Sequence, residues 1–190
     1  PGPLDELDQK KIKRIVDTNV IGPINCLSPA LELMKKNKAG HIVFVSSPAG
    51  FRGLPGAGMY GVTKSAITFL AETLKIEYAQ HNIKVQVIHP GFVKTAMTDK
   101  NTFPMPFIIS AEKAAKIIMK KIDLNSFEIS FPKRLILPMK LLRILPYPIY
   151  FFFNEEFCKK ISMTKITKNY FKCFEKLEED NVDELITCLH

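Results

Sequence analysis

The sequence predicts an α/β protein built on a parallel sheet of three strands with flanking helices. Helical and extended patterns alternate along the chain, in the order helix, strand, helix, strand, helix, strand. The extended segments are short, apolar and rich in β-branched residues, which is typical of strands buried on both faces. A helix between two strands is the connection that parallel strands need, so the alternation favours a parallel sheet over hairpins.

The first half of the chain supplies two helices and one strand. Residues 5–38 carry apolar side chains at roughly helical spacing, with an interruption at Gly22 and Pro23. HIVFV at 41–45 predicts a buried strand. Residues 46–58 are rich in glycine, proline and serine and predict a loop, and residues 59–80 predict the helix that follows.

The second half continues the alternation. NIKVQVIHP at 82–90 predicts a strand closed by Pro-Gly, and residues 92–109 predict a long loop. Residues 110–122 predict a helix that begins with a serine N-cap. SFEISF at 126–131 predicts the third strand.

The segment 133–153 reads KRLILPMKLLRILPYPIYFFF and is both apolar and basic. A membrane span is not expected, because Lys140 and Arg143 lie within it and three prolines interrupt it. Two interpretations stay open. The segment is either a pair of short helices that cover a substrate pocket or pack on a subunit, or a basic amphipathic patch lying on a membrane surface.

The composition changes again near residue 162, where the chain becomes more polar. We therefore interpret 1–161 as part of one domain and 162–190 as a helical tail or the start of a second module. The four cysteines, Cys26, Cys158, Cys173 and Cys188, are scattered and predict reduced thiols in a cytoplasmic protein. The histidines show no metal-ligand spacing, so no metal is expected.

The net charge of +8 raises nucleic acid and anionic membranes as partners. Basic and aromatic residues do not alternate as they do in nucleic-acid-binding surfaces, so we expect no nucleic-acid partner. Peripheral contact with a membrane through 133–153 stays open.

The stretch MYGVTKSAI at 59–67 carries the first chemical signal. Tyr60 and Lys64 are four residues apart, so on a helix they lie on one face, one turn from each other. A phenol beside an ammonium is a candidate for general acid–base catalysis, although this spacing alone is also common by chance. We expect the ammonium to stabilise the phenolate and lower the pKa of Tyr60 from its usual value of about 10.

Further polar residues accompany this pair. Ser47 follows the first predicted strand, at the carboxyl end where parallel sheets bind ligands. Asn19 lies four residues before Pro23, which has no N–H to donate to the Asn19 carbonyl. That carbonyl is a candidate partner for a water molecule in a proton relay. The alternative is simply two helices separated by a Gly-Pro break.

Together with the loop PGFVKT at 90–95, these residues resemble the short-chain dehydrogenase/reductase family. The family pattern is a helix asparagine, a serine about a dozen residues before Y-x-x-x-K, and P-G-x-x-x-T after the next strand. The sequence segments GHIVFVSSPAG, YGVTKSAI and IHPGFVKTAMT also resemble those of the family, and the resemblance covers residues 1 to about 160. It implies a partial, doubly wound Rossmann-type sheet containing the last three strands.

The resemblance also implies roles for individual residues. Tyr60 would transfer a proton, Lys64 would activate it and bind the nicotinamide ribose, and Ser47 would orient the substrate oxygen. Asn19 would hold a water that links Lys64 to solvent. The cofactor NAD or NADP would also contact the loop after the second strand, through Pro90, Gly91, Phe92, Val93 and Thr95.

The glycine-rich turn that normally opens this family is missing from the sequence, and we expect a chain truncated at its N-terminus. A literal G-x-G-x-x-G does occur at 56–61. We reject it as the cofactor fingerprint, because Leu54-Pro55 precedes it where a strand is required. The preference for NAD or NADP is therefore not readable, and this chain alone is expected to be weakly active or inactive.

The predicted function is interconversion of a ketone and a secondary alcohol. Apolar residues of the 92–109 loop predict an apolar substrate, and the candidate contacts are Phe103, Met105 and Phe107, with Ser47 and Tyr60 at the reacting oxygen. The family typically forms homo-oligomers, so we expect one here. The alternative is a non-catalytic remnant that binds a membrane surface or another protein.

Overall fold

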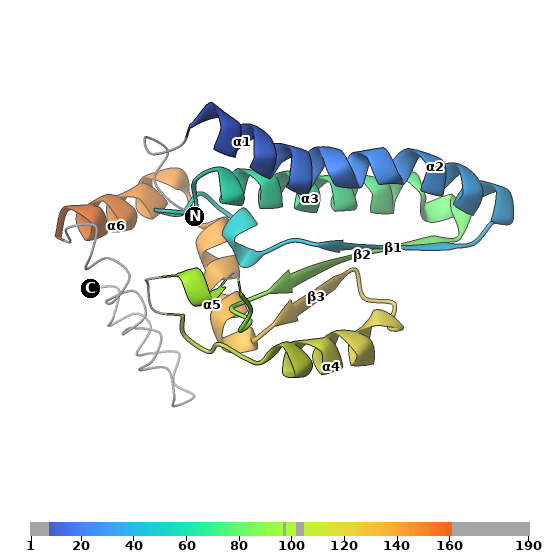
Figure 1. Cartoon of the computed structure of the whole chain (residues 1–190). Coiled ribbons are helices and arrows are strands. Elements are labelled where there is room, and N and C mark those ends of the chain that lie inside the picture. Colours follow the sequence, from blue (N-terminus) through green and yellow to red (C-terminus); the bar gives the residue numbers. More distant parts are fainter. Residues whose placement is uncertain (1–7, 97, 102–104, 161–190) are drawn as a thin grey trace. The chain divides into compact units, whose positions relative to one another are not determined.

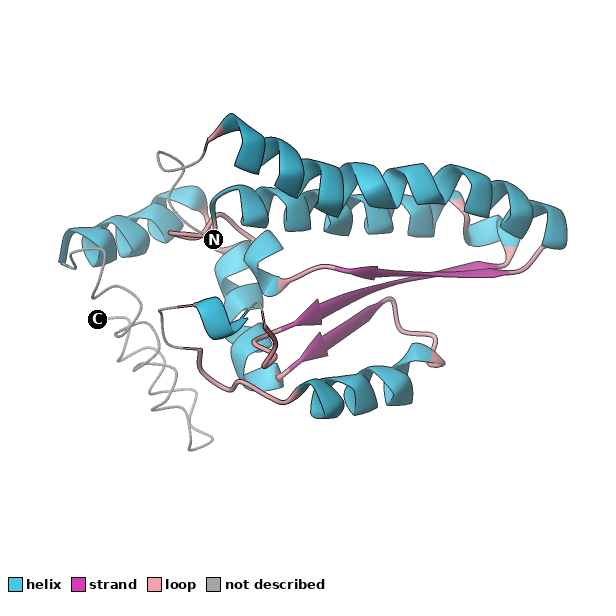
Figure 2. Ribbon diagram, in the orientation of Figure 1, coloured by secondary structure: helices cyan, strands magenta, loops and turns pink. Residues whose placement is uncertain are grey.

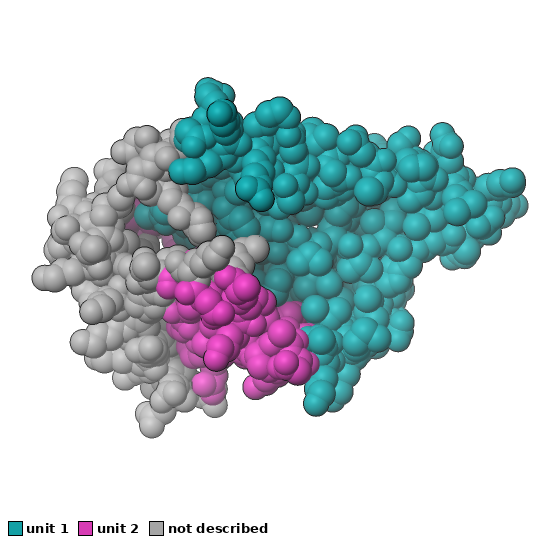
Figure 3. Space-filling model, in the orientation of Figure 1, with its two compact units in different colours: residues 1–90, 115–130 teal, residues 91–114, 131–190 magenta. Residues whose placement is uncertain are grey.

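A computed structural model describes residues 8–96, 98–101 and 105–160 of the chain. These residues divide into two compact units, shown in teal and magenta in Figure 3. The first unit comprises residues 1–90 and 115–130, and the second comprises residues 91–114 and 131–190. The proposed second module at 162–190 lies outside the described residues.

The sheet has the order β1-β2-β3, with β1 at Gly40–Val45, β2 at Ile83–Pro90 and β3 at Glu128–Phe131. The β1–β2 pair is parallel, from Gly40 opposite Ile83 to Val45 opposite Ile88. All three arrows point the same way in Figure 2, which confirms the predicted parallel α/β sheet. β3 begins two residues later than predicted, because the Ser126 carbonyl accepts a hydrogen bond from the Gln86 side chain (2.7 Å).

The N-terminal helices form one continuous rod. It consists of α1 (Gln9–Val16), a π-helical turn (Asp17–Ile21) and α2 (Gly22–Asn37). The Asp8 carboxylate begins the rod by accepting from the Lys11 amide (2.8 Å). Lys38 ends it with a left-handed backbone, φ 49°, which breaks the helix before β1.

The helix α3 (Gly58–Glu77) covers one face of the sheet beside α2, and the 115–122 part of α4 (Ala111–Ile122) lies on the other side (Figure 1). The core between α3 and the sheet is apolar. It contains Phe44, Ile67, Ala71, Leu74, Ile83, Val85 and Val87. Half-buried Leu27, Leu31 and Met34 of α2 pack against this core, so the helical periodicity of the sequence corresponds to a half-buried apolar stripe.

The second unit contains the long loop and the last two helices. The loop closes on itself through an isolated bridge between Val93 and Ile109. The apolar basic segment forms α5 (Lys133–Ile144) and α6 (Tyr147–Lys160), with Pro146 between them. This matches the predicted pair of short helices, and no helix in the described part of the chain is long and apolar enough to cross a membrane.

Candidate active site

Tyr60 and Lys64 lie on the first two turns of α3. The residues before the helix form a turn in which Gly56 has a positive φ of 73°, so the rejected glycine pattern serves as the entry to this helix. The Lys64 ammonium lies 5.6 Å from the centre of the Tyr60 ring. The spacing in the sequence therefore does place the phenol and the ammonium on one face.

Ser47 lies two residues after the end of β1 and leads into the turn that approaches the same helix. Its hydroxyl accepts from the Ala49 amide (3.2 Å) and so caps a short turn at Pro48–Gly50. The Ser47 side chain also acts on the Tyr60 phenol and lowers its pKa. Gly50 allows the turn to approach α3 closely, since a Cβ at this position would lie 2.6 Å from the Lys64 carbonyl carbon.

The electrostatics differ from the expectation for Tyr60. Burial raises the pKa of the Tyr60 phenol, and the hydrogen bond with Ser47 opposes that rise. The predicted net lowering of the Tyr60 pKa is wrong, because the effect of burial is the largest one. The Lys64 ammonium instead donates to the Val45 carbonyl (3.0 Å), and burial lowers the pKa of Lys64 itself. At neutral pH the Tyr60 phenol therefore keeps its proton.

Asn19 lies within the π-helical turn, which carries it toward α3. Its amide donates to the Thr63 hydroxyl (3.1 Å), and that hydroxyl donates to the Tyr60 carbonyl (2.9 Å). The rod passes through this point without a break, so two separate helices are ruled out here. π-Helical turns are frequently found at functional sites. The water relay through the Asn19 carbonyl stays a prediction.

A groove of about 440 Å³ runs between α2 and the outer edge of β1. Asn19 and Lys64 both line it, together with apolar residues of α2 and β1 such as Leu27 and Ile42. The strand β1 is the edge of the sheet, so this groove follows its unpaired side. Two of the four candidate catalytic residues therefore share one accessible surface of the first unit.

The predicted cofactor loop begins at Pro90, the last residue of β2 in the first unit. Gly91, Phe92, Val93 and Thr95 belong to the second unit. The Gly91 amide donates to the Phe131 carbonyl (2.7 Å), and a Cβ on Gly91 would lie 2.8 Å from Leu135. The Thr95 amide donates to the Thr98 hydroxyl (2.8 Å), so the loop is ordered by its own contacts.

The predicted substrate residues also belong to the second unit. Phe103 lies outside the described residues. Met105 is half-buried, and its sulfur accepts from the Asn101 amide (3.5 Å). Phe107 is half-buried with a positive φ of 56°. Their role in binding a substrate stays a prediction.

Sequence reasoning missed a set of polar residues around Lys64. Thr63 and Thr68 lie one residue before and four residues after it, and both hydroxyls are buried. His89 and Glu128 lie on β2 and β3 and are hydrogen-bonded to each other (3.1 Å). A threonine at i+4 from the lysine was the available signal, because it shares the same helix face.

These observations define a class: an α/β protein with a phenol, a serine hydroxyl and an ammonium gathered after one parallel strand, an arrangement suited to proton transfer. The sequence profile of the family described as short chain dehydrogenase matches residues 1–104, and the chain belongs to this family.

Known proteins similar to this chain agree with that assignment. An uncharacterized oxidoreductase of Myxococcus xanthus is 38% identical over 144 residues, covering 76% of this chain and 57% of the relative. ElxO with NADP bound is 26% identical, with a TM-score of 0.58, covering 68% of this chain and 60% of that chain. A short-chain dehydrogenase of Sphingobium yanoikuyae with NADPH has a TM-score of 0.64 at 18% identity, covering 77% and 61%, and shows the fold alone. The chain thus spans a little over half the length of the Myxococcus relative.

Proposed function

We propose that this chain carries the proton-transfer site of an NAD- or NADP-dependent oxidoreductase that interconverts a ketone and a secondary alcohol. The observation that supports this most directly is the Lys64 ammonium 5.6 Å from the centre of the Tyr60 ring, with Ser47 acting on the same phenol. Family membership and the oxidoreductase relatives support the same reaction class.

The donor set fits a nicotinamide cofactor. An ammonium has three N–H groups, and Val45 accepts one of them (3.0 Å), so Lys64 can also donate to ribose hydroxyls. Tyr60 and the loop residues Pro90, Gly91, Phe92, Val93 and Thr95 complete the proposed binding set. When bound, the cofactor supplies or accepts the hydride. ElxO has NADP bound. For this chain we propose NAD or NADP as the cofactor.

In the direction of ketone reduction, Tyr60 gives its proton to the substrate oxygen while a hydride reaches the carbonyl carbon. Ser47 holds that oxygen by a hydrogen bond, and the Lys64 ammonium stabilises the phenolate that remains. The raised pKa of Tyr60 favours the protonated phenol at neutral pH, which suits this direction. Oxidation of an alcohol needs the phenolate and so would require higher pH or a stronger influence of Lys64.

We propose a small apolar ketone or alcohol as substrate, supported by the half-buried Met105 and Phe107 of the loop. Enzymes of this family typically form oligomers, and we propose a homo-oligomer. Its support is the exposed apolar surface of α3, where Phe69 is 71% and Ile76 is 77% exposed.

The test combines cofactor binding with turnover. The chain is titrated with NADH and NADPH by fluorescence, and then assayed on apolar ketones in parallel with Tyr60→Phe. We expect Tyr60→Phe to bind the cofactor with unchanged affinity and to lose turnover. Tyr147→Phe, at an exposed tyrosine of α6, is the matched control and should behave like the unaltered chain. Turnover that survives Tyr60→Phe would refute the role of the phenol.

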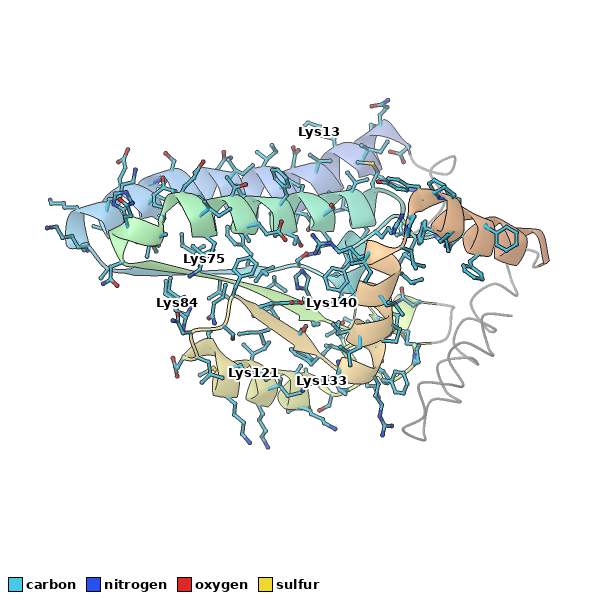
Figure 4. All side chains as sticks on the ribbon, turned by 180° about the vertical axis from the view of Figure 1, so that it is seen from behind. Lys13, Lys75, Lys84, Lys121, Lys133 and Lys140 are labelled. Carbon is cyan, nitrogen blue, oxygen red and sulfur yellow. The ribbon has the colours of Figure 1, made fainter. Side chains whose placement is uncertain are left out.

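A second candidate is a membrane-surface protein without catalysis. It is supported by exposed apolar residues on α5 and α6, among them Leu137 (63%), Ile144 (74%) and Phe152 (64%). The α5 helix also carries cations, including Lys133 and Lys140, which are labelled in Figure 4. Such a surface can bind anionic lipid through apolar burial and charge together.

Vesicle sedimentation distinguishes the two candidates. We expect Ile144→Ser with Phe152→Ser to weaken binding to vesicles that contain anionic lipid, while cofactor binding stays unchanged. Phe69→Ser, an equally exposed substitution on α3, is the control. Equal vesicle binding by all of these chains would refute membrane contact through α5 and α6.

A further inference from the structure

A chain of hydrogen-bonded polar groups, all buried except the half-buried Glu128, connects β3 to the helix turn that carries Lys64. His89, at the end of β2, is 2% exposed, and its Nδ1 lies 3.1 Å from the Glu128 carboxylate on β3. Its Nε2 lies 3.1 Å from the Thr68 hydroxyl on α3. The Phe51 ring packs against the imidazole, with the ring centres 4.7 Å apart.

The chain continues from Thr68 to the backbone of Lys64. The Thr68 hydroxyl oxygen lies 3.0 Å from the Lys64 carbonyl oxygen, and the Ser46 hydroxyl donates to the same carbonyl (2.8 Å). The Ser46 and Thr68 hydroxyls are also hydrogen-bonded to each other (2.8 Å). Ser46 immediately precedes Ser47 in the sequence. The Ser46 hydroxyl therefore links the segment that carries Ser47 to the backbone of Lys64, and these are the two residues proposed to flank Tyr60.

This arrangement holds Lys64 by its backbone, independently of its ammonium. The Lys64 carbonyl lies within hydrogen-bond distance of two side-chain hydroxyls in addition to the bonding of the helix, and both of these side chains, Ser46 and Thr68, are buried. In a low-dielectric interior such hydrogen bonds are stronger and fix geometry more tightly than surface contacts do. The backbone of Lys64 is therefore held by Ser46 in the loop after β1 and by Thr68 one turn further along α3, and Thr68 is in turn held by His89 of β2.

We propose that Glu128, His89 and Thr68 are positioning residues for the Tyr60–Lys64 pair, acting through the Lys64 backbone. The importance of this positioning for catalysis rests on the proposed function. The positioning of Lys64 itself does not depend on that function. The imidazole has a defined orientation, because a carboxylate only accepts and Nδ1 must therefore carry a hydrogen toward Glu128. Nε2 of the neutral ring then accepts the single hydroxyl hydrogen of Thr68, and the Lys64 carbonyl accepts from the Ser46 hydroxyl beside it.

The orientation of the ring suggests a matched pair of substitutions. Glutamine places its amide near the position of Nε2 and can keep the bond to Thr68, whereas asparagine places its amide near Nδ1 and can keep only the bond to Glu128. If positioning runs through Thr68, His89→Gln should preserve the Lys64 environment and His89→Asn should not. Thr68→Ser and Thr68→Val form a second pair, with and without the hydroxyl.

The readout is the titration of Lys64 in the full chain, followed by NMR with lysine labelled at the ε-carbon and assigned through Lys64→Arg. Burial lowers the pKa of Lys64, so loosening its position should raise that pKa toward the usual value. We expect Thr68→Val, Ser46→Ala and His89→Asn to raise the midpoint by about half a pH unit, a roughly threefold change in proton affinity. Thr68→Ser and His89→Gln should stay near the unaltered chain.

The exposed His81→Gln, at the far end of α3, is the control and should leave the midpoint unchanged. The proposal is overturned if Thr68→Val and Ser46→Ala lower the melting temperature but leave the Lys64 midpoint in place. The network would then only stabilise the fold. This readout needs no turnover, so failure of the oxidoreductase assay would leave its outcome readable. A Lys64 midpoint that responds to the network, without cofactor binding, would instead count against the proposed function alone.

Discussion

Gly50 offers the sharpest test of how the Ser47 turn and the Lys64 helix fit together. A Cβ built on Gly50 would lie 2.6 Å from both the Lys64 carbonyl carbon and the Ser65 amide nitrogen. Both are backbone atoms, so no side chain can rotate away. An ordinary contact begins near 3.4 Å, and the two segments would need to separate by about 0.8 Å (3.4 − 2.6) in Gly50→Ala.

The size of the effect follows from this overlap. Inserting a methyl group into a packed contact that must shift costs about 1–3 kcal/mol. For a chain of this length, each kcal/mol lowers the melting temperature by roughly 2–4 °C, so we expect a fall of about 2–12 °C. The same displacement moves Ser47 away from Lys64. A shift of about 1 Å at a reacting group can cost on the order of a hundredfold in rate.

The assay is a thermal melt followed by circular dichroism, with Gly53→Ala as the matched control. A Cβ on Gly53 would meet nothing within 4 Å, although this residue lies only three positions further along the chain. We expect Gly53→Ala to melt within about 1 kcal/mol of the unaltered chain. Equal melting temperatures for Gly50→Ala and Gly53→Ala would refute the close approach of this turn to α3.

Three further predictions concern titration and packing. Because burial raises the pKa of Tyr60, its absorbance step near 295 nm should lie above pH 10, and the difference between the unaltered chain and Tyr60→Phe should show it. The stability that accompanies this raised pKa is fully present below pH 10 and is lost as the pH rises through the pKa of the folded state. The free energy of unfolding of Tyr60→Phe should therefore fall less steeply with rising pH than that of the unaltered chain. An absorbance step below pH 10 would contradict both statements. Gln86→Leu removes the donor to the Leu124 carbonyl (3.0 Å) and to the Ser126 carbonyl from a fully buried residue, and should cost about 1–3 kcal/mol in a urea melt; no loss would show that these carbonyls find other donors. Gly91→Ala should also destabilise, since its Cβ would lie 2.9 Å from Pro132, and an unchanged melt would show that the loop can move aside.

Much of the fold could be predicted from local patterns. HIVFV and NIKVQVIHP predict strands because β-branched side chains have restricted rotamers and favour the extended backbone. Both segments form strands whose limits lie within one residue of the predicted ones. Gly22 and Pro23 indicated an interruption, but not its form. A proline prevents one helical hydrogen bond, and whether the helix then breaks or widens into a π-turn depends on what it packs against.

The candidate residues of the first unit were also readable, because helix geometry fixes which side chains share a face. Tyr60 and Lys64 are one turn apart on α3, and Ser47 is at the end of the preceding strand. Their proton affinities were not readable. The pKa of Tyr60 depends on burial, and the partner of the Lys64 ammonium is a carbonyl nineteen residues away in the sequence.

The sequence by itself therefore determined the class of this protein, the order of its elements and the residues that can transfer a proton. These follow from short-range rules of backbone geometry and side-chain chemistry. Only the tertiary structure decided which of those groups meet, and that Glu128 of β3 and His89 of β2 are connected through Thr68 to the backbone of Lys64 on α3. Desolvation and long-range hydrogen bonds arise only when distant segments pack together, so no local pattern encodes them.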